Sequence, residues 1–136
     1  MTVKPYVLTE RGFLRSEQVV YPMEERGLQF GDGVYEVVRL YSGTYIWLHE
    51  HLDRLYRSAA AIRLAVPFSH EELAERLEQL RRMNDVREDA ILYLQVTRGA
   101  SRAAMHFRPK TGRTCTPTFS RWREKQRKWR AACARF

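Results

Sequence analysis

The charge of this chain changes abruptly near residue 100. Residues 1–100 contain 13 Lys and Arg against 15 Asp and Glu, whereas residues 101–136 contain 11 Lys and Arg and a single acid, Glu124. The net charge of +8 therefore comes from the tail. A segment with so much like charge and few regularly spaced apolar residues does not bury a core of its own. The sequence predicts one folded domain, residues 1–100, followed by a basic, irregular tail, residues 101–136.

The two cysteines, Cys115 and Cys133, both lie in that tail. Two thiols do not make a disulfide framework, and the residues near them offer no further metal ligands at a useful spacing. No apolar run is long enough to span a bilayer. These features predict a reduced, cytoplasmic protein with no metal site and no membrane contact.

Several short apolar runs of residues 1–100 have the composition of strands, because they are rich in Val, Ile, Leu and aromatic residues and are bounded by turn residues. "YVLTERGFLR" predicts a hairpin, and "GVYEVVRLY" predicts a buried strand. The turn "SGT" at Ser42–Thr44 is expected to lead into a return strand, "YIWL". "AILYLQVTRG" predicts a third clear strand that ends at Gly99.

Two helices are indicated between these strands. Residues 48–64 place apolar side chains three and four positions apart, at Leu48, Leu52, Leu55, Ala59 and Ile62. Ser69 followed by Glu72 is a capping box for a second helix, residues 71–83, with Leu73, Leu77 and Leu80 inward. Strands, two helices and a further strand predict an α/β (α+β) domain, with two helices covering one face of a twisted sheet.

The segment "LQFGDGVYEVVRLYSG" places a loop with two glycines and an aspartate directly before a strand. Loops of this kind often bring backbone close to a ligand, because glycine accepts dihedral angles that other residues resist. Alternation along the strand puts Tyr35 and Val37 on one face and Glu36 and Val38 on the other. The alternative from periodicity alone is an ordinary hairpin in which Tyr35 is part of the core.

Three motifs in this order carry a family resemblance: "FGDGVYEVV", "HLDRL" and "QVTRG". Over residues 10–101 the chain resembles the class IV aminotransferases, which use pyridoxal 5'-phosphate, and is most similar to the D-amino-acid (D-alanine) aminotransferases. Branched-chain aminotransferases and aminodeoxychorismate lyase are more distant likenesses. The resemblance implies the small N-terminal domain of fold type IV, a homodimer, and exchange of amino groups between D-amino acids and 2-oxo acids. It does not fix which amino acid is the substrate.

The resemblance assigns the cofactor-binding role to the helix motif "HLDRL". Arg54 matches the arginine that holds the cofactor phosphate, and a guanidinium suits a phosphate because it offers two parallel charge-assisted hydrogen bonds. His51 lies one turn before Arg54, so both side chains can face one site. The alternative is a surface ion pair between Arg54 and Glu50, four residues earlier.

The substrate side of the pocket is assigned to the strands. The resemblance places Tyr35 on the substrate side, has Val37 shape side-chain selectivity, and matches Tyr93, in "ILYLQV", to a pocket tyrosine. We expect Tyr35 to lie with Arg54 and His51 around an open, phosphate-sized hollow. A buried strand tyrosine without a ligand remains the alternative for Tyr93.

Transamination needs a lysine amine that forms a Schiff base with the cofactor. In the family this lysine follows the "VTRG" strand, in a second domain. Lys125 and Lys128 lie in the basic tail and match no family motif, so we assign no catalytic residue and expect the Schiff-base lysine beyond residue 136. The chain alone is expected to be inactive.

The tail also departs from the family pattern. Related D-amino-acid enzymes follow "VTRG" with a Pro-Arg-x-His loop that binds the substrate carboxylate, whereas Arg102 and His106 stand at another spacing and receive no such role. A frameshift near Ser101 explains the jump in charge and the late cysteines together. It predicts one missing or extra nucleotide there, and an intact reading frame in resequenced genomic DNA removes the hypothesis.

Two further functions compete with a fragment of an aminotransferase. The tail segment "RWREKQRKWR" mixes cations with two tryptophans, a composition that can bind phosphates and stack on bases. Any polycation does this weakly, so nucleic acid is not the expected partner. The other alternative is a fragment that only dimerises, with apolar surface exposed where a second domain would cover it.

Overall fold

The computed structural model of this protein describes residues 4–101 and 121–122. Its elements, in chain order, are β1 Tyr6–Thr9, β2 Gly12–Arg15, a 3-10 turn Ser16–Gln18, α1 Arg26–Phe30, β3 Gly33–Tyr41, β4 Thr44–Tyr45, α2 Leu48–Ala61, α3 His70–Met83, β5 Ala90–Thr97 and β6 Arg121–Trp122. Both predicted helices, the first hairpin and the two long strands are confirmed. The described part contains no helix with the length and apolar character needed to cross a membrane.

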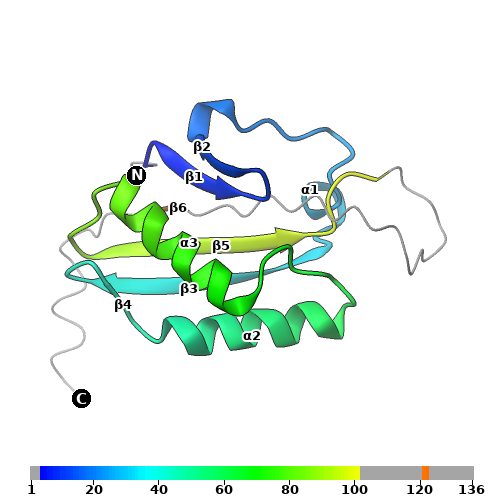
Figure 1. Ribbon diagram of the computed structural model, residues 1–136. Coiled ribbons are helices and arrows are strands. Elements are labelled where there is room, and N and C mark those ends of the chain that lie inside the picture. The colour runs from blue at the N-terminus through cyan, green and yellow to red at the C-terminus, as the bar shows by residue number, and fades with distance from the viewer. Residues whose placement is uncertain (1–3, 102–120, 123–136) are drawn as a thin grey trace, which may run out of the picture.

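The main sheet has the strand order β4-β3-β5-β6, and all its pairings are antiparallel. β3 and β5 pair along nearly their full length, so Val37 lies opposite Tyr93 and Glu36 opposite Leu94. β1 and β2 form a separate two-stranded sheet. In Figure 1, α2 runs beneath β3, α3 passes in front of β5 and β3, and the β1–β2 hairpin lies above α3. The mixed helix and sheet architecture agrees with the predicted fold class.

The core fills the space between the main sheet and the two helices. The core consists mainly of leucine and valine side chains that are almost fully buried: Val38, Leu40, Leu52, Leu55, Leu73, Leu77, Leu80, Leu92 and Leu94. Because β3 and β5 alternate, one face of each strand supplies this core, and the other face is left more exposed. The hairpin is joined to α3 by Asn84, whose side-chain amide exchanges hydrogen bonds of 3.0 and 2.9 Å with the backbone of Tyr6.

The start of α2 differs from the prediction. The expected return strand "YIWL" is only the two-residue β4, because Trp47 takes a left-handed backbone with φ 51° and caps the helix that starts at Leu48. At its other end α2 stops at Ala61, and Ile62, expected inward, is 36% exposed. α3 begins as predicted, with the Ser69 hydroxyl accepting a hydrogen bond of 3.1 Å from the Glu72 backbone N–H.

The backbone of the loop before β3 requires glycine at two positions, Gly31 and Gly33. A five-residue helix, α1, was not predicted, and Gly31 ends it in a left-handed conformation with φ 64°. A Cβ built on Gly33 would lie 2.6 Å from the Val96 carbonyl oxygen of β5. The loop is therefore glycine-rich because it turns out of a helix and then passes close to a neighbouring strand.

Replacing Gly33 with alanine is expected to lower the free energy of unfolding by about 1–3 kcal/mol, because the added methyl group overlaps the Val96 carbonyl oxygen and the paired strands must shift to accept it. Urea unfolding measures this loss. The matched control is Gly31→Asn, because a Cβ at Gly31 meets nothing within 4 Å and asparagine tolerates the left-handed backbone. Equal stabilities for Gly33→Ala and the unmodified chain would contradict this explanation of the glycine.

Most of the basic tail lies outside the described residues. Ser101 and the two residues of β6 are described, and β6 pairs with the middle of β5 at Leu92 and Tyr93. The predictions of an irregular tail and of a frameshift near Ser101 therefore stay predictions.

Candidate functional site

A buried carboxylate on β3 holds two side chains of α2. The Nε and Nη2 atoms of Arg54 donate to the two oxygens of Glu36, each at 2.6 Å. The Nδ1 atom of His51 lies 2.9 Å from Oε2 of the same carboxylate and 3.4 Å from Nη2 of Arg54. The three residues meet because Glu36 is on the helix-facing side of β3 and α2 carries His51 and Arg54 one turn apart.

The members of this cluster differ in exposure. The side chain of Glu36 is 5% exposed, that of His51 21%, and that of Arg54 59%. The carboxylate is thus an interior anchor, while the guanidinium extends to the surface. Arg54 pairs with Glu36 and not with Glu50, so the alternative of a simple helix ion pair does not describe this arginine.

The cluster shifts the protonation of its charged members. Burial, the largest single influence, raises the pKa of Glu36, but hydrogen bonds and charge from Arg54 and His51 outweigh burial and hold it below its ordinary value. The hydrogen bonds from Arg54 to Glu36 raise the pKa of the guanidinium. The carboxylate is therefore ionised and the guanidinium charged at neutral pH.

The depressed pKa of Glu36 predicts acid sensitivity. A carboxyl group with a lowered folded pKa stabilises the fold above its ordinary value of 4.5, and that stabilisation is lost as the pH falls through the folded pKa. We expect the free energy of unfolding to decrease as the pH is lowered beyond about 4.5. We expect this decrease to be less steep in Glu36→Gln. Urea unfolding between pH 7 and the acid limit of the fold measures both slopes, and parallel slopes would contradict the assignment.

The opposite face of the same strands carries the predicted substrate-side residues. The rings of Tyr35 and Tyr93 stack with centroids 5.7 Å apart and an interplanar angle of 18°. Tyr35 is 64% exposed and Val37 43% exposed, so neither is part of the core. The hydroxyl of Tyr93 donates to the Gln95 side chain at 3.2 Å, and burial followed by the nearby Tyr35 raises the pKa of Tyr93. Two tyrosines and a valine thus form an aromatic, accessible sheet face.

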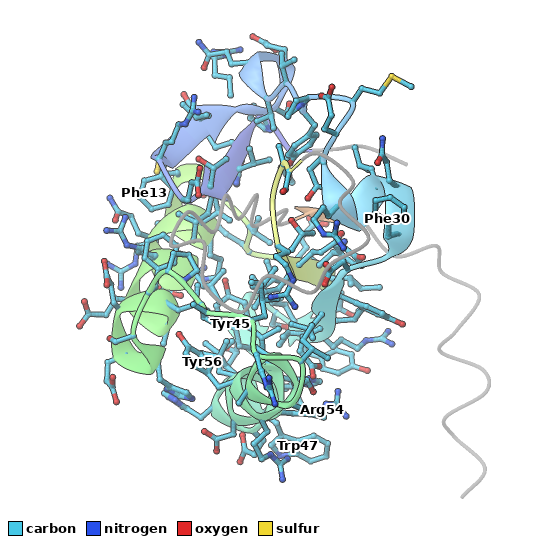
Figure 2. The ribbon with its side chains drawn as sticks, turned by 90° about the vertical axis from the view of Figure 1, so that its right-hand side faces the viewer. Phe13, Phe30, Tyr45, Trp47, Arg54 and Tyr56 are labelled. Atoms are coloured by element: carbon cyan, nitrogen blue, oxygen red, sulfur yellow. The ribbon has the colours of Figure 1, made fainter. Side chains whose placement is uncertain are left out.

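The five predicted site residues form two groups. Arg54 and His51 meet beside Glu36, and Tyr35, Val37 and Tyr93 share the other face of β3 and β5. Tyr35 lies on the face of β3 opposite to Glu36, because neighbouring residues of a strand point to opposite faces, and the hollow shared by Tyr35, Arg54 and His51 stays a prediction. Figure 2 shows Arg54 on the outer side of α2, away from Tyr56, which lies toward α3.

The edge of β3 connects the two groups. Among the described residues β4 pairs only with Leu40 and Tyr41, and the Ile46 N–H donates to the Arg39 oxygen, so the earlier part of β3 has β5 as its one strand partner. Arg54 is on the helix below this edge, and Tyr35 and Val37 lie on the face above it. The two groups therefore lie on opposite faces of the same strand.

A second ion cluster fixes the glycine loop, and no sequence motif indicated it. Asp32 accepts hydrogen bonds from Nε of Arg26 at 2.8 Å and from Nε of Arg98 at 3.0 and 3.1 Å. Arg98 also donates to the backbone oxygens of Ile62 and Arg63, just after α2. The arginine of "QVTRG" therefore joins the glycine loop to the helix that carries Arg54. Conversely, no three potential metal ligands gather anywhere in residues 4–101 and 121–122.

The chain is similar in sequence and in fold to known proteins. Residues 33–135 match the family model described as amino-transferase class IV. The D-alanine aminotransferase of Listeria monocytogenes is 48% identical over 103 residues, which are 76% of this chain and 35% of that protein. The D-alanine aminotransferase of Bacillus licheniformis is 54% identical over 85 residues, 62% of this chain and 29% of that protein. The chain thus spans about a third of the length of the curated relatives it matches.

Solved structures show the same fold. The branched-chain aminotransferase of the thermophilic archaeon Thermoproteus uzoniensis, with norvaline, superposes with a TM-score of 0.72 at 23% identity, covering 88% of this chain and 40% of that one. The Escherichia coli branched-chain amino acid aminotransferase gives a TM-score of 0.70 at 23% identity, covering 88% and 40%. At such identities the likeness concerns the fold alone. Because the family model matches residues 33–135, which are most of this chain, the chain belongs to the class IV aminotransferases.

Proposed function

We propose that this chain forms the cofactor-phosphate side of a pyridoxal 5'-phosphate-dependent D-amino-acid aminotransferase. Arg54 and His51 bind the phosphate, and Tyr35, Val37 and Tyr93 line the substrate side. The observation that carries the proposal is the guanidinium of Arg54, 59% exposed, fixed by a buried carboxylate beside His51. The D-alanine preference is supported by the names of the relatives at 48% and 54% identity.

The donor set fits a phosphate monoester. Arg54 is charged at neutral pH, because Glu36 raises the pKa of its guanidinium, and its planar donors match two phosphate oxygens. When bound, pyridoxal phosphate supplies the electron sink for amino-group transfer. The residues of this chain would bind and orient: Arg54 and His51 hold the phosphate, and the Tyr35–Tyr93 stack limits where the substrate side chain lies. We assign no residue of this chain to proton transfer.

A chimera tests the proposed activity. Residues 1–100 of this chain replace the corresponding segment of the Bacillus licheniformis D-alanine aminotransferase, one of the relatives above. With 2-oxoglutarate as acceptor, we expect the chimera to form pyruvate from D-alanine at about one turnover per second or faster. The same chimera should be much slower with L-leucine, the donor that would favour a branched-chain enzyme.

The outcomes of the chimera experiment separate the alternatives. A folded chimera that transaminates L-leucine and not D-alanine would favour the branched-chain alternative. A folded chimera that retains no cofactor would contradict the phosphate assignment. The isolated 136-residue chain, given the same substrates, is expected to form no pyruvate; turnover by it would mean that a catalytic lysine lies within this chain.

We propose a homodimer as the working assembly. Four apolar side chains between β2 and β3 are strongly exposed: Val20 85%, Met23 84%, Leu28 69% and Phe30 56%. Exposed apolar groups gathered in one segment are typical of an interaction surface. Sedimentation of the full chain checks this, and a monomer at all concentrations would contradict it.

We also propose a cytoplasmic location, because the two cysteines give no disulfide framework.

A further inference from the structure

We propose that Glu36 is a positioning residue that sets the phosphate-binding geometry of both Arg54 and His51. The inference rests on the proposed function, because it concerns the same phosphate. Neither the glycine motif nor the helix motif assigned any role to Glu36. The structure places its carboxylate between the two side chains, in contact with each.

Glu36 binds one particular edge of the Arg54 guanidinium. Arginine has five N–H donors, one on Nε and two on each Nη. Glu36 accepts from Nε and from Nη2, which together form the side edge of the group. The outer edge, made of Nη1 and the second N–H of Nη2, has no carboxylate or carbonyl partner among the described residues. This outer edge can give a phosphate two parallel hydrogen bonds while the side edge stays on Glu36.

The same carboxylate orients the ring of His51. A carboxylate only accepts hydrogen bonds, so the 2.9 Å approach of Nδ1 to Oε2 of Glu36 means that Nδ1 carries the proton and donates it. Nδ1 is then no acceptor for Nη2 of Arg54, 3.4 Å away, and the two donors share the carboxylate. Fixing Nδ1 leaves Nε2 as the ring atom for a ligand. Glu36 therefore determines the tautomer of His51 as well as the edge that Arg54 presents.

The surroundings of Glu36 distinguish positioning from simple structural pairing. Its neighbours on the same strand face, Val38 and Leu40, are fully buried and apolar. Burying a carboxylate among them is unfavourable, and an apolar residue generally packs such a position with equal or better stability. Arg54, in contrast, is 59% exposed and needs no buried partner to remain in solvent. A buried charge used to fix an exposed guanidinium is better explained by the ligand that the guanidinium binds.

The choice of glutamate over glutamine follows from the same geometry. A carboxylate accepts from Arg54 with both oxygens and from His51 with one of them. The amide of glutamine has one accepting oxygen, and its NH2 group would face an N–H donor of Arg54 or of His51. Glu36→Gln therefore breaks at least one of the three hydrogen bonds and sets an NH2 group against another N–H donor, so the geometry of the cluster is lost, whereas Glu36→Asp keeps two accepting oxygens on a shorter stem.

The test compares two ligands that differ only in the phosphate. Pyridoxamine 5'-phosphate and pyridoxamine are titrated calorimetrically into the full 136-residue chain, and neither forms an imine with surface lysines. The ratio of the dissociation constant of pyridoxamine to that of its phosphate measures phosphate recognition alone. We expect Glu36→Gln to lower this ratio about tenfold and Glu36→Asp to keep it within about threefold of the unmodified chain.

Glu25→Gln is the matched control for loss of a buried carboxylate. Glu25 is 3% exposed and accepts hydrogen bonds from the Leu28 N–H and the Thr97 hydroxyl, away from Arg54. This variant is expected to lose stability while keeping the ratio. In an Arg54→Ala background, Glu36→Gln is expected to change the ratio no further, because a positioning residue acts only through the group it positions.

Each outcome is decisive for one of the two ideas. If Arg54→Ala lowers the ratio but Glu36→Gln does not, the positioning role is wrong and the phosphate assignment stands. If Arg54→Ala leaves the ratio unchanged, the proposed function itself is wrong. If Glu36→Gln and Glu25→Gln lower the ratio equally, the effect is a general loss of structure and Glu36 positions nothing. Should Glu36→Gln fail to fold, a tenfold or larger loss in Glu36→Asp would likewise overturn the proposal, since that variant keeps both oxygens.

Discussion

Arg54→Ala, introduced into the chimera described above, is expected to weaken retention of pyridoxal phosphate by about tenfold to a hundredfold. The reason is that alanine removes both the charge and the paired donors that face a phosphate, while the other contacts of the ring remain. Turnover at saturating cofactor should fall less than retention. Dialysis followed by absorbance of the bound cofactor measures the loss.

Two variants of α2 make that experiment specific. Arg57→Ala removes another exposed arginine from the same helix, so it changes the net charge equally and should leave cofactor retention unchanged. Arg54→Lys keeps the charge but loses the planar pair of donors, so its retention should fall between Arg54→Ala and the unmodified chimera. Equal losses for Arg54→Ala and Arg57→Ala would show a diffuse charge effect and contradict a phosphate site at Arg54.

Leu92→Ala is expected to lower the free energy of unfolding by about 2–5 kcal/mol. Leu92 is 0% exposed in the middle of β5, on the face covered by the helices, so its truncation leaves a cavity that rigid neighbours fill only partly. Urea unfolding of the full chain, followed by far-ultraviolet circular dichroism, measures the change.

Ile91→Ala is the control for Leu92→Ala. Ile91 is the preceding residue of β5 and lies on the open, half-buried face, so the same kind of truncation there should lower stability by about 1 kcal/mol or less. If both variants lost equal stability, the core would not lie between β5 and the helices as described.

The elements that depend on local pattern could be predicted from the sequence. α2 and α3 have leucines at helical spacing, and the hydroxyl of Ser69 caps α3 as the motif indicated. β3 and β5 have the composition of strands, and the turn at Ser42 and Gly43 joins β3 to β4. These features involve residues near one another in the chain, so tertiary packing has little opportunity to override them.

Other features depend on how distant segments meet. Trp47 looked like a strand residue, but its left-handed backbone starts α2 and shortens the return strand. Glu36 drew no attention because its partners, His51 and Arg54, are 15 and 18 residues away and meet it only when α2 packs under β3. The aspartate of the glycine loop had no predicted partner, since its bond to Arg98 spans 66 residues. The local signals for the site were the helical spacing of His51 and Arg54 and the alternation that placed Tyr35 and Val37 on one face of the strand.

The measurement that most directly tests the central claim is a titration of the full chain with pyridoxamine 5'-phosphate. The titration is monitored by nuclear magnetic resonance of the side-chain nitrogens. We predict that pyridoxamine 5'-phosphate shifts the Nε–H signal of Arg54 and the ring nitrogen signals of His51 together, with one saturating curve. Pyridoxamine without phosphate should leave both unchanged. Saturating shifts confined to arginines of the basic tail, with Arg54 and His51 unmoved, would contradict the claim that this chain holds the cofactor phosphate at Glu36, His51 and Arg54.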